Sequence, residues 1–230
     1  MNYDSIAEAI QNITTWILPL LFAITMHEAA HGFAAARLGD DTALRLGRVT
    51  LNPFKHIDPV GTVLIPGLLL LFRSPFILGW AKPVPVNFAR LRRPKIGMAL
   101  VAAAGPGVNI VFAIISSLAL WLIPYVPDLA QLWLTSNLQN AISINIFLAV
   151  FNLLPLPPLD GGRILVGLLP RDLSNRLAQV EPYGFFIIIG LLFLIPMLTG
   201  LLSINFDPGY YLIRIPTNFV LSAIVGVFAP

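Results

Sequence analysis

The sequence predicts an all-α protein that crosses a membrane several times. Of its 230 residues, 57% are hydrophobic and only 11% are charged, and the mean hydropathy is +0.83. Soluble domains carry about 25% charged residues. The apolar residues also fall in long runs, and about 20 such residues let a helix span the hydrocarbon core. We therefore expect a single domain, residues 1–230, of about five to six membrane helices with a re-entrant or extended membrane-associated segment.

The first half of the chain supplies one spanning helix and the irregular segment. The helix is expected over residues 13–37, with Trp16 where an interfacial aromatic side chain belongs. Residues 60–87 begin with an apolar run that is short for a span, and Pro83 and Pro85 then exclude a regular helix. Irregular backbone at membrane depth must lie against protein or water. We therefore expect residues 60–87 to form a re-entrant segment beside the functional site.

The second half supplies the remaining elements. Residues 96–123 are a clear apolar span, and residues 140–162 are predicted to return through the membrane and to end in a proline-rich motif. Residues 163–179 have the pattern of an amphipathic surface helix. Residues 184–228 are expected to form the C-terminal helices, and the last possible span, 211–228, is weakened by Arg214 and Pro216.

The basic residues predict how the chain is oriented. If the N-terminus lies outside and residues 60–87 do not cross, every Lys and Arg except Arg214 falls on the cytoplasmic side. The helices at 13–37 and 140–162 then run in the same direction. Their C-terminal ends, which carry the two motifs described next, therefore lie near the same face.

The first motif is an H-E-x-x-H pattern inside an apolar, helix-compatible run at residues 26–31. On a helix, His27 and His31 lie one above the other on the same face, so their imidazole nitrogens can bind one ion. Zinc suits two such nitrogens with one further protein ligand. Glu28 can reach a metal-bound water and act as a general base.

A third ligand has to come from elsewhere in the chain. Asp160, in the apolar and proline-rich stretch 152–162, is the best candidate, although an ordinary loop residue explains it equally well. A histidine on an apolar helix is usually a satisfied core residue. Here, however, three ionisable side chains fall within five consecutive residues of a segment that otherwise resembles a membrane span. Each of them is energetically costly in hydrocarbon unless it is paired or binds a metal. His56 fits a loop or interfacial residue better than a spare ligand, and the chain has no cysteine to complete a structural zinc site.

These motifs resemble those of the site-2 protease family of intramembrane zinc metalloproteases. The H-E-x-x-H run is followed by N-x-x-P-x-P-x-L-D-G-G at residues 152–162. The stretches G-W-A-K-P-V-P-V-N at 79–87 and G-P-G-V-N at 105–109 point to the compact bacterial branch, without a PDZ domain. The resemblance covers roughly residues 18–169.

The resemblance implies a zinc-dependent intramembrane endopeptidase that hydrolyses peptide bonds in or near transmembrane segments of membrane proteins. It assigns one Zn²⁺ to His27, His31 and Asp160, and the role of catalytic base to Glu28. It also assigns to Asn152 the role of holding the substrate or stabilising the oxyanion. The implied location is the cell inner (plasma) membrane, multi-pass in the lipid bilayer, with the active site nearer the cytoplasmic face. The role of Asn109 and the oligomeric state stay open.

Two other classes of function fit parts of the pattern. A membrane zinc-binding transporter also places His and Glu on membrane helices, but along a transit path, whereas this chain has one cluster. A catalytically silent binding protein of the same fold is expected to lack Glu28, which is present. Nucleic acid is not an expected partner, because the basic residues are not interleaved with a polar, aromatic-rich surface.

Overall fold

The computed structural model describes residues 3–72, 79–204 and 206–230, and within these ranges the regular elements are helices. Five helices in the described part are long and apolar enough to span a membrane. They are Ile13–Leu38, Pro94–Tyr125, Asp128–Asn152, Glu181–Leu201 and Tyr210–Phe228. The predicted fold class, an all-α polytopic membrane protein, is therefore confirmed. Residues 73–78 of the predicted re-entrant segment lie outside the described residues.

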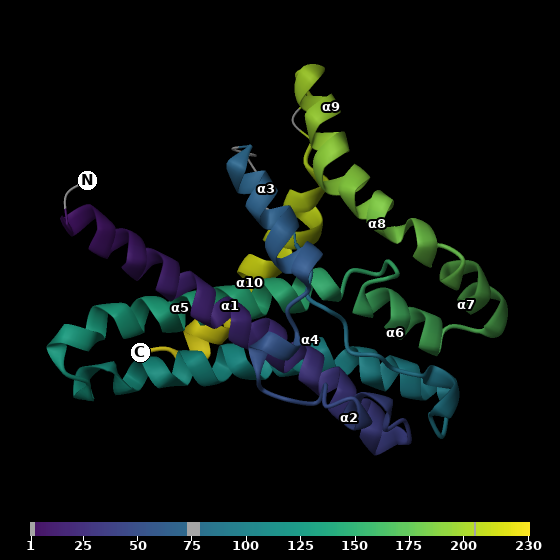
Figure 1. Ribbon diagram of the computed structural model, residues 1–230. Helices are drawn as coiled ribbons and strands as arrows, with labels where there is room; N and C mark the ends of the chain where they lie inside the picture. Colours follow the sequence, from purple (N-terminus) through teal and green to yellow (C-terminus); the bar gives the residue numbers. More distant parts are fainter. Residues whose placement is uncertain (1–2, 73–78, 205) are drawn as a thin grey trace.

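Three helices form the centre of the molecule: α1 (Tyr3–Leu38), α4 (Pro94–Ala119) and α5 (Asp128–Asn152). Each packs against the other two, and Figure 1 shows them running together through the body of the protein. Many buried residues of α4 are small, among them Gly97, Ala99, Ala102, Gly105 and Ala113. Small residues let helix backbones approach closely, which is how helices associate without a hydrophobic driving force from lipid.

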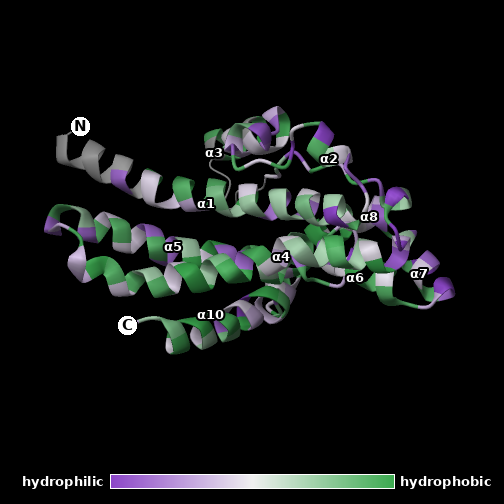
Figure 2. Cartoon of the chain, turned by 90° about the horizontal axis from the view of Figure 1, so that it is seen from below, coloured by the Kyte–Doolittle hydropathy of each residue, from purple (hydrophilic) through white to green (hydrophobic). Residues whose placement is uncertain are grey.

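The last helix, α10 (Ile215–Phe228), covers the side of the α4–α5 pair opposite α1 (Figure 2). Its Ile224 packs into a buried apolar cluster with Ala113, Ile142 and Ile146. The outward face of this helix is apolar and mostly exposed, as a lipid-facing surface must be in a spanning helix.

The chain between α1 and α4 is made of short pieces. These are α2 (Thr42–Arg45), η1 (Pro53–Lys55), η2 (Pro59–Leu64), α3 (Ile65–Leu71) and η3 (Phe88–Arg90). Between α3 and η3, residues 79–87 form no regular secondary structure, and we call this segment the strap. The strap contains Pro83 and Pro85, which exclude a helix as the sequence predicts.

Two segments are divided differently from the sequence-based expectation. The single helix expected at 140–162 is instead α5, which begins at Asp128 and ends at Asn152, a proline-rich turn, and then α6 (Asp160–Leu168). Pro155, Pro157 and Pro158 cause the break, because proline lacks the N–H that a helix needs.

The surface helix expected at 163–179 is likewise split. It consists of the end of α6 and a separate helix, α7 (Arg171–Ala178). Pro170 restrains the residue before it to extended backbone, so α6 cannot continue through Leu169.

The remaining helical pieces extend these elements. The first helix starts at Tyr3 rather than at residue 13, and α4 is prolonged by η4 (Leu120–Tyr125). In the C-terminal part, α8 (Glu181–Ile189), η5 (Gly190–Leu194) and α9 (Ile195–Leu201) run on as one rod that projects from the body (Figure 1). The short η6 (Tyr210–Arg214) then leads into α10.

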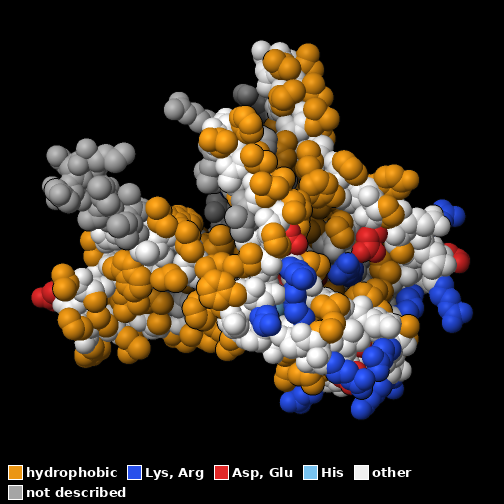
Figure 3. Space-filling view, viewed as in Figure 1, with side chains coloured by type: hydrophobic (Ala, Val, Ile, Leu, Met, Phe, Trp, Pro, Cys, Tyr) orange, Lys and Arg blue, Asp and Glu red, His pale blue; other side chains and the backbone are white. Residues whose placement is uncertain are grey.

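Polar and basic residues gather at one end of the molecule, around α2, the start of α4 and α7 (Figures 2 and 3). The exposed cations there include Arg37, Arg45, Arg92, Arg93, Arg171 and Arg176. The rest of the visible surface is largely hydrophobic (Figure 3). This separation of an apolar body from a charged end is what a protein held in a bilayer requires.

Candidate active site

The paired histidines lie one turn apart on α1, as their spacing predicts. Their Nε2 atoms are 3.1 Å apart, and the rings meet edge to face with centroids separated by 4.7 Å. The side chains of His27 and His31 are only 9% and 12% exposed. Both rings therefore point into the protein, toward α4 and α6, rather than toward lipid.

Asp160 meets the histidines although 129 positions separate it from His31. It is the first residue of α6, and its Oδ2 lies 3.1 Å from His27 Nε2 and 3.4 Å from His31 Nε2. The candidate ligand atoms of the three residues all lie within 4.8 Å of one another. Ligands about 2.0–2.1 Å from a tetrahedral zinc ion are themselves separated by about 3.3 Å. The three predicted ligands are thus brought together at a spacing that fits zinc.

Glycines make this convergence sterically possible. A Cβ atom on Gly105 of α4 would lie 2.5 Å from His31 Nε2 and 2.7 Å from His27 Cε1, so α4 can pass the imidazoles only without a side chain there. Gly161 similarly packs against the backbone of Leu153, which leaves no room for a Cβ. The first glycine accommodates the histidines, and the second lets α6 carry Asp160 close to the end of α5.

An amide chain fixes the orientation of the His27 ring. His27 Nδ1 is 2.6 Å from Asn109 Oδ1, and Asn109 is completely buried. The Asn109 Nδ2 donates to the Ala23 carbonyl at 3.2 Å and to Asn145 Oδ1 at 2.8 Å. A carbonyl can only accept, so the amide nitrogen must face Ala23 and the amide oxygen must face His27. His27 therefore carries its proton on Nδ1.

His31 is fixed in the same way, since its Nδ1 lies 2.8 Å from the carbonyl of Val101 and must donate to it. With both Nδ1 atoms protonated, the neutral imidazoles present Nε2 lone pairs to the carboxylate of Asp160. The buried Asp160 Oδ2 has no hydrogen-bond donor among the described residues. Three electron-pair donors thus converge without a proton between them, which is unfavourable unless a cation joins them. The donor set, two imidazoles and one carboxylate, suits zinc.

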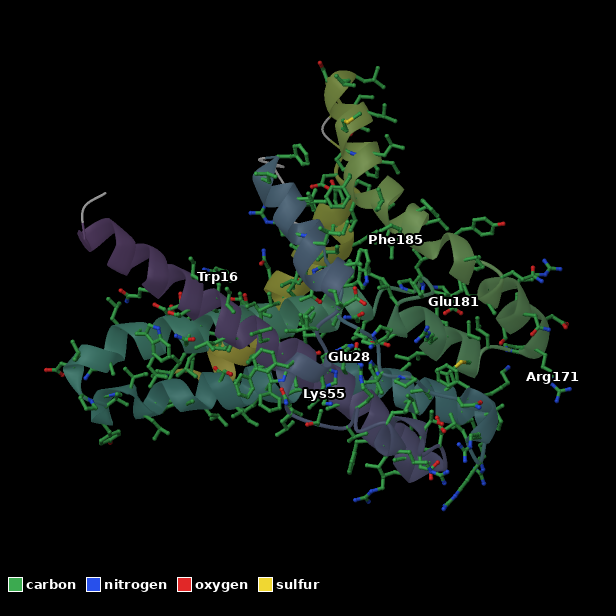
Figure 4. The ribbon with its side chains drawn as sticks, in the orientation of Figure 1. Trp16, Glu28, Lys55, Arg171, Glu181 and Phe185 are labelled. Carbon is green, nitrogen blue, oxygen red and sulfur yellow. The ribbon has the colours of Figure 1, made fainter. Side chains whose placement is uncertain are left out.

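Glu28 lies next to the His27 ligand position and contacts the strap. Its Oε2 accepts a hydrogen bond of 2.7 Å from the backbone N–H of Val84. Figure 4 shows Glu28 in the middle of the molecule, where α1 passes the central helices. Glu28, His27, His31 and Asp160 line one cavity of about 600 Å³, whose other walls come from the strap, α4 and α5.

Asn152 ends α5 and lines the same cavity. Its Nδ2 donates to the Leu148 carbonyl at 3.0 Å. An amide NH₂ group has two hydrogens, so one remains to donate to a bound substrate. The structure therefore brings this predicted residue to the cavity with a donor to spare.

His56 lies away from this cluster. It is buried and its Nε2 is 3.1 Å from the Thr50 carbonyl, while the candidate metal ligands found in the described part of the chain are His27, His31 and Asp160. Asn145, which accepts a hydrogen bond from Asn109, was not predicted from the sequence to belong to the site. An amide in a membrane helix is nevertheless a signal that a polar partner lies nearby.

The far end of the strap is tied to a buried carboxylate. Asp40 accepts hydrogen bonds from the Asn87 N–H at 2.6 Å and from the Thr42 hydroxyl at 2.5 Å. Burial alone would raise the pKa of Asp40. These hydrogen bonds, the Thr42 N–H and the nearby Arg90 charge outweigh that effect and hold its pKa below the usual range.

Taken together, a polytopic helical fold and a buried His-His-Asp centre beside a glutamate define a membrane metallohydrolase. The sequence profile of peptidase family M50 matches residues 122–196, which include Asp160. The chain is 41% identical over 185 residues to "Putative zinc metalloprotease YwhC" of Bacillus subtilis, covering 79% of this chain and 80% of that protein. It is 31% identical over 172 residues to "Putative zinc metalloprotease Rip2" of Mycolicibacterium smegmatis, covering 75% of this chain and 64% of that protein.

The chain therefore belongs to peptidase family M50, the site-2 protease family. It is a zinc metalloendopeptidase and a multi-pass membrane protein. No solved structure matches the chain significantly.

Proposed function

We propose that this metalloendopeptidase hydrolyses peptide bonds in or near the transmembrane segments of membrane proteins, at a zinc ion held by His27, His31 and Asp160. The observation that carries the proposal is the convergence of two Nε2 lone pairs and a buried carboxylate oxygen at 3.1–3.4 Å inside a membrane bundle. The cavity that these atoms line is walled by spanning helices. A peptide that reaches them is therefore delivered from, or close to, the bilayer.

The residues around the cavity can divide the steps of hydrolysis between them. Zinc at this centre would activate a water molecule and polarise the scissile carbonyl. Glu28 takes the proton from that water and later delivers it to the leaving nitrogen. The second amide hydrogen of Asn152 donates to the substrate carbonyl as negative charge develops on its oxygen.

A transmembrane substrate must also change its conformation. In an α-helix each interior carbonyl already accepts a hydrogen bond from the N–H four residues later. Such a carbonyl is poorly accessible to attack, so the substrate has to unwind over a short stretch. The irregular turn that precedes Asp160 and the strap both border the cavity. Irregular backbone of this kind is tolerated at membrane depth where it lines a water-filled cavity.

The charge distribution supports a location in the inner (plasma) membrane, with the active site nearer the cytoplasmic face. The cations gather at the end where α1 finishes at Leu38 and where α7 lies (Figure 3). Positively charged connections face the cytoplasm in membrane proteins. His31 lies two turns from the end of α1, and so close to this charged end.

The proposal is tested with the Glu28→Gln variant, which keeps the shape of the side chain and removes the base. Purified wild type and variant are each reconstituted into lipid vesicles with a purified single-span membrane substrate, and bound zinc is measured by elemental analysis. We expect cleavage to be abolished in the variant while zinc stays bound. Continued cleavage would refute the role of Glu28. Zinc flux into vesicles without any cleavage by the wild type would favour a transporter.

A further inference from the structure

The strap is fastened to the protein by backbone hydrogen bonds along its length. The N–H groups of Trp80, Lys82 and Asn87 donate to Gly61 O, His56 O and Asp40 Oδ2 at 3.1, 2.9 and 2.6 Å. These acceptors come from the short pieces between α1 and α3. The strap is therefore a fixed wall of the cavity, held on both sides of Val84.

Arg48 holds the same backbone through its carbonyls. Arg48 is buried, and its Nη2 lies 2.7 Å from the Lys82 oxygen and 3.4 Å from the Pro83 oxygen. A guanidinium on two successive carbonyls restrains the peptide planes that lead into Val84. The direction of the Val84 N–H is thus set by contacts other than the bond that it makes.

The Val84 N–H donates to the Glu28 carboxylate. Among residues 83–85 of the strap, Val84 is the one residue that has a backbone N–H to donate. Pro83 and Pro85 flank it and have no N–H. A slip of the strap by one residue in either direction would place a proline opposite Glu28. Pro85 also confines Val84 to extended backbone. The Pro-Val-Pro order therefore specifies a single amide hydrogen that faces the carboxylate.

We propose that the Val84 N–H is the positioning donor that orients Glu28 for catalysis, an inference that rests on the proposed peptidase function. A glutamate side chain has three rotatable bonds and adopts several rotamers when it has no partner. The bond to Oε2 selects one of them and leaves Oε1 to take the proton from water. In this arrangement Val84 acts through Glu28 and is not itself a catalytic residue.

The kinetic test compares Val84→Pro with Val84→Ala in the full chain. Both variants remove the isopropyl group, and only the proline variant removes the N–H. We expect kcat of the proline variant to be roughly 10- to 100-fold below that of the alanine variant, the loss typical of one hydrogen bond to a charged group, with KM and bound zinc equal in the two. Equal kcat values for the two variants would overturn the inference.

A second measurement needs neither activity nor a change at Val84. Hydrogen exchange of the Val84 amide is followed by NMR in protein labelled with ¹⁵N-valine, as wild type and as Glu28→Ala. We expect the amide to exchange at least 10-fold faster in the variant, because its acceptor is gone. The same rate in both proteins would overturn the inference even if Val84→Pro fails to fold. If the wild type cleaves no substrate, the proposed peptidase function fails, whereas this exchange difference still reports the contact.

Discussion

The two halves of the metal centre are built in opposite ways. His27 and His31 sit one turn apart on a single helix, so local geometry sets their relative position. Asp160 sits at the start of a nine-residue helix after a proline-rich turn, and its position depends on how α6 packs against α4 and the end of α5. The spacing of the two histidines is therefore set within α1, whereas the orientation of their rings and the arrival of Asp160 depend on close packing between helices.

The largest expected effect comes from closing the space between α4 and the histidines. Gly105→Ala would place a methyl group 2.5 Å from His31 Nε2 and 2.7 Å from His27 Cε1, so the imidazoles or α4 must move. We expect at least a 100-fold loss of peptidase activity together with loss of bound zinc, measured by reporter cleavage and elemental analysis. Gly107→Ala is the matched control, since a Cβ there meets no atom within 4 Å. If Gly105→Ala retains full activity and zinc, the packing account of the centre is wrong.

An intermediate effect is expected from the amide chain behind His27. Asn109→Leu keeps the number and branching of the side-chain heavy atoms but leaves the His27 Nδ1–H without its acceptor, so the ring is no longer fixed. Loss of such an outer partner typically weakens metal binding 10- to 100-fold. Competition with a chelator should therefore show zinc affinity lowered by roughly that factor.

Asn137→Leu is the control for that experiment. Asn137 is a buried amide on α5 whose Nδ2 donates to the Trp133 carbonyl, away from the histidines. It should change zinc affinity little. Equal weakening by both substitutions would mean that general polarity in the bundle, and not the orientation of His27, governs the site.

The smallest expected effect concerns the anchor of the strap and depends on pH. The pKa of Asp40 is lower in the folded protein than in the unfolded chain, so this carboxylate stabilises the fold above its unfolded pKa of about 3.9. That contribution is lost as pH falls through the lower folded value. The difference in the free energy of unfolding between wild type and Asp40→Asn should therefore be largest near pH 7 and should decrease below about pH 4. Thermal unfolding in detergent across this pH range measures the difference, and Asp41→Asn serves as the control variant. A difference between wild type and Asp40→Asn that does not change with pH would contradict the role of the Asp40 carboxylate as an anchor of the strap.

Much of the site was accessible from sequence because its signals are local or chemically costly. The H-E-x-x-H spacing defines a shared helix face whatever the rest of the chain does. An acid in an apolar stretch, such as Asp160, draws attention because an unpaired charge is expensive there. The prolines predicted that residues 83–85 would be extended, but not that a single N–H between them would face Glu28.

The boundaries and the partners at longer range were less accessible. The prediction of one helix over residues 140–162 gave too little weight to Pro155, Pro157 and Pro158 as helix breakers. As a result, it did not anticipate α6, the separate helix that presents Asp160. Asn145 gave no spacing pattern that linked it to Asn109, because the two amides lie on different helices. Contacts between helices depend on their relative rotation and translation, which one helical period does not encode.

The sequence by itself determined the all-α membrane class, the helix that carries the histidine pair, and the ability of His27 and His31 to face one ion, because hydropathy and the helical repeat act within a few turns. Only the tertiary structure decided that Asp160 Oδ2 reaches both Nε2 atoms, that Asn109 sets the His27 tautomer, and that Val84 bonds to Glu28. Those contacts join residues that lie between 56 and 133 positions apart. They exist because glycines and small residues let three helices and a strap pack within hydrogen-bonding distance.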